Sequence, residues 1–218
     1  MKLKPILLAI VAGALWGCCR VPTEPAPIPP KEEVKMEVKA PEPPVQEPEN
    51  PFFTEWTTPF QTPPFDLIQK KHYLPAFEKG MSIQAGEIDA IAKNPEAPTF
   101  ENTIVALDNS GELLSKTSAV FFSLKDSIGD DEFQKLAETV EPMLAKHGDN
   151  IYLNPALFAR VKAVKESSAM ASLTAEQRKI TEETYKDFIE SGAHLDDAAK
   201  ARMREINEAF SLITLRFE

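Results

Sequence analysis

The chain has 218 residues, of which 43% are hydrophobic, and its formal net charge is −10. This length permits one or two domains, and such a chain can bury a sizeable core without disulfides or metals. An acidic surface repels phosphate groups, so we expect no nucleic-acid partner. The two cysteines, Cys18 and Cys19, are adjacent. The rest of the chain therefore has no disulfide framework, no thiolate nucleophile and no cysteine zinc site.

Residues 1–17 show the three parts of a secretory signal peptide. Lys2 and Lys4 supply positive charge, residues 6–16 form an apolar run, and Gly17 is a small residue before a cleavage point. A helix over this apolar run would span roughly 16 Å, which is about half the hydrocarbon core of a bilayer. We therefore expect residues 1–17 to be a signal peptide and not a transmembrane helix.

The segment Leu15-Trp16-Gly17-Cys18 resembles a bacterial lipobox, although Trp16 is bulkier than the residue usual at that position. The resemblance implies that Cys18 is acylated on sulfur and becomes the new amino terminus. The alternative is an ordinary signal peptide that is cleaved nearby. Several acyl chains anchor a protein stably, and no aspartate follows Cys18. We therefore expect an exported lipoprotein, held to the periplasmic face of the outer membrane through its lipid.

Residues 18–50 are predicted to be a disordered, proline-rich tether. Ten of the thirty residues from Pro22 to Pro51 are proline, and the segment has no aromatic residue before Phe52. It buries too little apolar surface to offset the entropy of ordering, and proline-rich chain favours an extended conformation. We interpret it as a spacer that holds the body away from the membrane. The alternative is a ligand for a proline-binding module.

From residue 51 to residue 218 the sequence predicts an all-α, multi-helix bundle. Apolar residues recur at helical spacing, and the alternating pattern of strands is missing. The predicted helices carry their apolar stripes over residues 74–92, 104–121, 133–147, 157–164 and 199–217, and a further helix is expected to follow Thr174 and to end at Gly192. The expected N-caps are Thr99, Asp130 or Asp131, Asn154 and Thr174, and the last helix is expected to start near Asp196.

Three features of this pattern leave alternatives open. The Asn109-Ser110-Gly111 segment predicts either a break in the second helix or close packing against a neighbour. Pro142 should bend the third helix or remove one backbone hydrogen bond. The last helix has a seam typical of helix packing, and we expect the seam to lack part of its partner because the periodicity stops without a cap. Its apolar positions are Ala199, Met203, Ile206, Phe210, Ile213 and Phe217.

The sequence predicts no catalytic residue and no metal ligand within these 218 residues. His72, His147 and His194 are far apart in the chain, and none belongs to an HExxH motif. We expect structural or surface roles for all three. Paired acids are expected to lie at helix starts or in the tether, where they serve capping. These pairs are Glu32-Glu33, Asp130-Asp131, Glu182-Glu183 and Asp196-Asp197.

Six blocks of the body resemble a known family. They are FDLIQKKHYLPAF, NPEAPTFENTIVAL, SGELLSKTSAVFFSL, GDNIYLNPALFARV, EETYKDFIESGAHL and ARMREINEAFSLITLRF, in this order from residue 65 to residue 217. In these blocks the chain is similar to the amino-terminal region of the zinc oligopeptidases of the thimet oligopeptidase type, above all to bacterial peptidyl-dipeptidases and oligopeptidase A. The resemblance covers about residues 51–218.

The resemblance implies an all-helical lobe of a two-lobed peptidase whose channel admits short peptides. Such enzymes bind zinc through an HExxH helix and a further glutamate in their carboxyl-terminal half, so no residue of this chain inherits those roles. One hypothesis is that the chain is the inert amino-terminal portion of a lipid-anchored zinc peptidase and is truncated at its carboxyl end. The other is a non-catalytic, tethered helical lipoprotein that binds peptides or a partner. Both predict that the 218 residues alone show no peptidase activity.

Overall fold

The computed structural model describes residues 49–214. Every regular element in this range is helical, which confirms the all-α prediction. The predicted signal peptide, Cys18, residues 18–48 of the predicted tether and Phe217 lie outside the described residues. No helix between residues 49 and 214 is long and apolar enough to cross a membrane.

The long helices follow the predicted stripes closely. They are α1 (Tyr73–Ala92), α3 (Glu112–Ile128), α4 (Asp131–Tyr152), α5 (Pro155–Glu166), α6 (Ala175–Glu190) and α7 (Asp197–Thr214). Shorter elements, which the sequence did not predict, are the 3-10 turns Pro51–Phe53, Pro59–Gln61, Lys70–His72 and Ser168–Ser172. The α6 helix ends two residues before the predicted Gly192, which lies in the following turn.

The predicted caps form because short polar side chains can accept the free N–H groups of a first helical turn. Asp130 accepts from the backbone N–H groups of Glu132 and Phe133 at 3.1 and 3.0 Å. Thr174 forms a reciprocal capping box with Gln177. Asn154, Thr99 and Asp196 also accept backbone N–H groups of their own first turns.

The predicted second helix is divided into three pieces at the glycine-containing segment. A π-helical turn (Phe100–Val105) leads into the short α2 (Ala106–Asp108), and α3 begins after Gly111. Gly111 has φ +76°, and a Cβ atom there would lie 2.4 Å from Nε2 of Gln84. Both readings of the segment therefore hold, because the glycine breaks the helix and also admits a neighbouring side chain.

Pro142 lies inside α4 without dividing it. The helix runs unbroken from Asp131 to Tyr152, although proline cannot donate the backbone hydrogen bond of its turn. The stripe before it is buried as predicted, with Phe133, Ala137 and Val140 at 2% exposure or less, whereas Leu144 and His147 after it are half-buried. Tertiary packing of this stripe therefore outweighs the loss of one backbone bond.

Two clusters of buried apolar side chains form the interior. The first lies among α1, α3, α4 and the Pro51–Phe53 turn and is rich in aromatic rings. The second lies among the end of α1, the Phe100–Val105 turn, α5 and α6. The buried members of the first are Phe52, Tyr73, Ala76, Phe77, Leu114, Val120, Phe121, Phe133, Ala137 and Val140. Those of the second are Ile88, Ile91, Ile104, Ile151, Leu157, Val161, Val164, Phe188 and Ala193.

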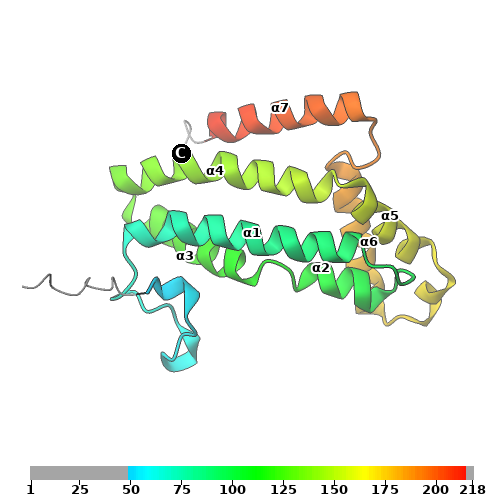
Figure 1. Ribbon diagram of the computed structural model, residues 1–218, viewed down its shortest axis with the longest axis horizontal. Helices are drawn as coiled ribbons and strands as arrows, with labels where there is room; N and C mark the ends of the chain where they lie inside the picture. Colours follow the sequence, from blue (N-terminus) through cyan, green and yellow to red (C-terminus); the bar gives the residue numbers. More distant parts are fainter. Residues whose placement is uncertain (1–48, 215–218) are drawn as a thin grey trace, which may run out of the picture. The chain divides into compact units, whose positions relative to one another are not determined.

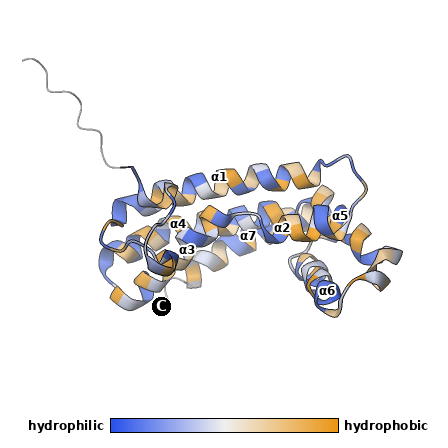
Figure 2. Ribbon diagram, turned by 90° about the horizontal axis from the view of Figure 1, so that it is seen from below, coloured by the Kyte–Doolittle hydropathy of each residue, from blue (hydrophilic) through white to orange (hydrophobic). Residues whose placement is uncertain are grey.

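Helix α7 lies beside α4, while α1 packs against α3 and α4, and α5 packs against α6 (Figure 1). Each long helix carries both hydrophobic and hydrophilic turns, as expected for amphipathic helices (Figure 2). The seam predicted for α7 is largely exposed from residue 206 to residue 213, in agreement with the expectation that it lacks part of its partner. Ile206, Phe210 and Ile213 are 47%, 67% and 49% exposed, so most of the seam is not covered by the helices between residues 49 and 214.

Candidate functional site

A cleft lies between residues 52–61, α1 and α3. Its volume is about 710 Å³. Its walls combine aromatic rings with charged side chains of both signs, a mixture that suits a short peptide better than a purely apolar ligand. The lining residues are Phe52, Phe53, Thr54, Glu55, Trp56, Gln61, Lys79, Ile83, Glu112, Leu113 and Lys116.

Two lysines lie over aromatic rings in this cleft. The Nζ atom of Lys79 is 3.8 Å from the ring centroid of Phe53, and that of Lys116 is 3.8 Å from the ring centroid of Trp56. Such contacts stabilise a partly desolvated ammonium group. Burial lowers the pKa of Lys116, while the nearby carboxylates of Glu112 and Glu55 act in the opposite direction. The cleft can therefore contact a carboxylate or a backbone carbonyl.

The part of the chain that the structure describes has no cluster of metal-binding side chains, in the cleft or elsewhere. Between residues 49 and 214 no three histidine, cysteine, aspartate or glutamate side chains come together in a way that could hold a metal ion. The residues present in that range therefore do not fit a zinc site, and no reaction step is assigned to them.

The three histidines lie in different elements, as the sequence spacing indicated. His72 accepts the backbone N–H of Gln69 at its Nδ1 atom, 3.0 Å away, within the turn that precedes α1. His147 lies on α4 and its Nε2 atom is 2.8 Å from Oε1 of Gln84 on α1. His194 is exposed in the turn after α6. The His147 side chain therefore joins α4 to α1, whereas the cited contact of His72 closes its own turn.

Gln84 also links α1 to the break before α3. Its amide nitrogen lies 3.3 Å from the hydroxyl of Ser110, and the nearby Glu87 accepts the backbone N–H of Gly111 at 2.8 Å. Together with His147 these groups form a polar network between α1, α4 and the glycine turn. Burial lowers the pKa of His147, so the network favours a neutral imidazole.

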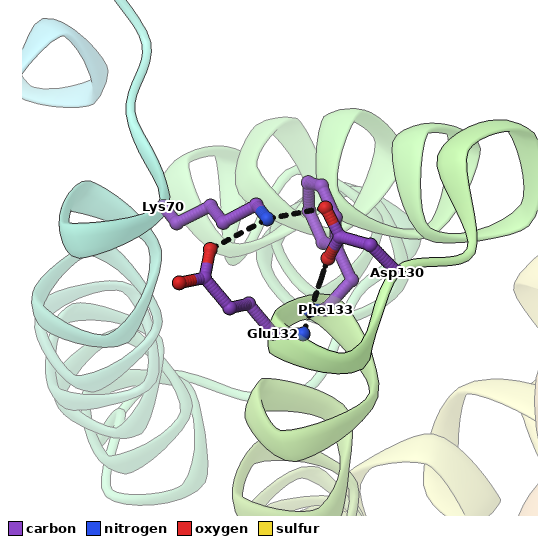
Figure 3. Close-up of polar contacts among 4 residues, drawn as sticks. All are labelled: Lys70, Asp130, Glu132 and Phe133. Atoms are coloured by element: carbon purple, nitrogen blue, oxygen red, sulfur yellow. Dashed lines mark hydrogen bonds and ion pairs between the residues drawn. The ribbon is translucent and has the colours of Figure 1, made fainter. Parts of the chain in front are cut away.

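A second polar cluster fixes the start of α4 (Figure 3). Lys70 donates to the carboxylates of Asp130 and Glu132, the latter at 2.7 Å, and its Nζ atom lies 5.1 Å from the ring centroid of Phe133. The hydrogen bond to Asp130, followed by that to Glu132, raises the pKa of Lys70. The Lys70 contact and the backbone N–H groups lower the pKa of Asp130. This cluster is a structural tie between the amino-terminal segment and α4.

One prediction about the paired acids is wrong. Asp130-Asp131 and Asp196-Asp197 lie at helix starts, but Glu182-Glu183 lies in the middle of α6. There Glu182 pairs with Lys165 of α5 at 2.8 Å, and Glu183 pairs with Lys179 one turn earlier at 2.6 Å. Acidic residues on an exposed helix face are placed by such i,i+4 and interhelical pairs as readily as by capping.

The cleft residues were not singled out from the sequence. Lys79 and Lys116 are far apart in the chain and come together only because α1 and α3 pack side by side. Neither belongs to a motif, so only knowledge of the fold could have found them.

No family model matches the chain. Among curated proteins, it is 41% identical over 168 residues to dipeptidyl carboxypeptidase from Escherichia coli, which covers 77% of this chain and 25% of that protein. Identity to dipeptidyl carboxypeptidase from Salmonella typhimurium is 38% with the same coverage. Oligopeptidase A from Haemophilus influenzae is 27% identical over 156 residues, which are 68% of this chain and 23% of that protein.

The chain is a homologue of dipeptidyl carboxypeptidase and oligopeptidase A. This relationship confirms the family resemblance found from the sequence blocks. The chain spans about a quarter of the length of the curated relatives it matches.

Proposed function

We propose that this chain is the amino-terminal portion of a lipid-anchored, zinc-dependent peptidyl-dipeptidase that degrades short peptides in the periplasm. The observation that carries the proposal is the 41% identity over 168 residues to a dipeptidyl carboxypeptidase. In this proposal the zinc site belongs to polypeptide outside the 218 residues, because the residues between 49 and 214 offer no suitable donor set. The helices described above then form a supporting wall, and the polar ties at Lys70 and Gln84 keep that wall rigid.

A hybrid protein tests this proposal. The segment of Escherichia coli dipeptidyl carboxypeptidase that aligns with this chain is replaced by residues 51–218, and release of a carboxyl-terminal dipeptide from a blocked peptide is measured. We expect zinc-dependent, chelator-sensitive cleavage by the hybrid and none by the 218-residue chain alone. The same enzyme lacking the segment is the control. A folded but inactive hybrid, or zinc-dependent cleavage by the 218 residues alone, would contradict the proposal.

The lipid anchor has its own test, for which the adjacent cysteine is a matched control. Cys18→Ser should remove the protein from the membrane fraction, since Cys18 follows the Leu15 and Gly17 positions of the lipobox. Cys19→Ser should leave it there, and globomycin should block processing of the unaltered chain. Equal fractionation of the two variants would exclude acylation at Cys18 as the anchor.

The second candidate function is a tethered module that binds short peptides, and the cleft favours it. The Lys116 ammonium and the Trp56 ring could contact the carboxylate and an apolar side chain of a peptide. Calorimetric titration of the 218-residue chain with short peptides separates this function from an inert wall. Binding that Lys116→Met abolishes would support the module. If the 218-residue chain binds no peptide in this titration and the hybrid protein is active, the results would support the first function, the peptidase portion.

A further inference from the structure

Helix α7 is held to α4 by polar contacts. The amide nitrogen of Asn207 donates to Oδ1 of Asp149 at 2.6 Å, and Arg204 donates to Oδ1 of Asn150 at 3.0 Å. The large apolar side chains of α7 lie to one side of these positions and stay largely exposed. The contact between α7 and α4 therefore leaves Ile206 and Ile213 about half exposed, while Phe210 borders the junction with α4.

A groove adjoins this stripe where α7 meets α4. Its volume is about 270 Å³, and the small residues Ala145 and Gly148 of α4 form part of its lining, with Tyr152 and Phe210 beside them. A Cβ atom at Gly148 would meet nothing within 4 Å. A groove with small residues admits the side chains of a neighbouring helix. We call the stripe and this groove the α7 face: Ile206, Phe210, Ile213, Ala145, Gly148 and Tyr152.

The spacing of the stripe identifies the kind of partner. Ile206, Phe210 and Ile213 are separated by four and then three residues, which is the repeat of a helix–helix seam. A single exposed isoleucine would need no explanation. Three large apolar side chains on one helix face next to a groove mark an interaction surface. An amphipathic helix meets these requirements, since its own apolar stripe can lie along α7 and insert side chains into the groove.

We propose that the α7 face binds an amphipathic helix from the part of the peptidase polypeptide that has no counterpart in this chain. The relatives supply the argument for this occupant, because the chain matches only 25% of their length at 41% and 38% identity. The inference rests on the proposed function in one respect, namely that this chain works together with such a polypeptide. The competing occupant is a second copy of the chain.

Two glycine variants test the proposal in the hybrid protein and in the 218-residue chain. Gly148→Leu fills the groove, and Gly86→Leu is its control, because Gly86 also lies inside a long helix with nothing within 4 Å of its Cβ position. Glycine is unfavourable inside a helix, so both variants should leave the melting temperature of the 218-residue chain unchanged or raised. In the hybrid, Gly148→Leu should lower the melting temperature by several degrees, whereas Gly86→Leu should not.

A second pair of variants removes the stripe itself. Ile206→Ser with Ile213→Ser should destabilise the hybrid and spare the 218-residue chain. Ile128→Ser with Ile180→Ser is the control, because these isoleucines are 55% and 36% exposed on other helices. If both α7-face variants behave like their controls in an active hybrid, the proposal is wrong while the proposed function stands.

Two further outcomes distinguish a second copy of the chain as the occupant and a failure of the proposed function. Sedimentation of the 218-residue chain as a dimer that Gly148→Leu converts to a monomer would overturn the proposal in favour of a second copy. A hybrid that is folded but inactive, and that the α7-face variants still destabilise, would support the α7 face and contradict the proposed function.

Discussion

Two helix contacts in this chain show opposite ways of joining helices. Under α1, Tyr73 lies among the rings of Phe52, Phe121 and Phe133 with centroid distances of 5.4, 5.2 and 5.8 Å. These rings shield the Tyr73 hydroxyl from water, and this burial raises the pKa of Tyr73 to about 12. Between α4 and α7 the described hydrogen bonds join polar side chains, and the apolar stripe stays exposed. The first contact stabilises the fold by itself, whereas the second leaves surface for a partner.

The largest loss of stability is expected from a variant that disrupts the aromatic contact. Phe121 is fully buried and touches the rings of Tyr73, Phe77 and Phe133. Phe121→Ala should lower the free energy of unfolding by about 3–5 kcal/mol, because it removes buried apolar area and leaves a cavity. Urea denaturation followed by circular dichroism measures it. Ile206→Ala on α7 is the comparison and should change stability by less than about 0.5 kcal/mol. Similar losses in the two variants would contradict the contrast between the contacts.

A buried polar contact should have an intermediate effect. Arg160 is 7% exposed and donates to the carbonyl oxygens of Asn94 and Glu96 and to the side chains of Asn102 and Thr103. Arg160→Leu removes this donor from one buried and three more accessible acceptor residues and should cost about 2 kcal/mol. Arg160→Lys should recover only part of this loss, because an ammonium group cannot reproduce the guanidinium fork. Full stability of the lysine variant in urea denaturation would show that charge alone suffices.

The polar contact of α7 should have a smaller and local effect. Asn207→Ala removes the hydrogen bond to Asp149 and should weaken the attachment of α7 by about 1 kcal/mol. Hydrogen exchange should show faster exchange in α7 and unchanged protection in α1 and α3. Ser211→Ala is the control, because its hydroxyl donates to the carbonyl of Glu208 within α7. Loss of protection throughout the chain would mean that α7 unfolds only with the rest.

The smallest effect concerns pH. Burial lowers the pKa of His147 below its ordinary value of 6.5, so the unfolded chain binds a proton more readily than the folded chain. The contribution of His147 to stability is therefore complete above about pH 6.5 and is lost as the pH falls through the lower, folded pKa. The difference in unfolding free energy between the native chain and His147→Gln should shrink from neutral to mildly acidic pH. A difference that is constant over this range would contradict the assignment.

Local sequence information was sufficient for most helix boundaries. Asp130, Asn154 and Thr174 cap their helices as predicted, because a cap depends on residues within the same turn. The break at Gly111 was foreseen as one of two readings, and the structure shows that both apply. Spacing within one helix was equally reliable for the buried stripe of α4.

Features that depend on distant residues were not predictable in this way. The cleft joins residues near position 54 with residues near positions 79 and 116, and no local pattern marks such a meeting. Glu182 looked like a capping residue, but its partner is Lys165 on another helix. The α7 seam and its missing partner were expected from the sequence, whereas the polar attachment of α7 to α4 required the fold.

Helix α1 belongs to both apolar clusters, with Tyr73 and Phe77 in the first and Ile88 and Ile91 in the second. If either cluster unfolds, one end of α1 loses the apolar residues that pack against it. Partial unfolding at one end would thus require breaking α1 in its middle, near Ile83 and Gln84, where the backbone hydrogen bonds are those of a continuous helix. We therefore expect the two clusters to fold and unfold together. Because both contain residues of α1, this helix couples them into one cooperative unit.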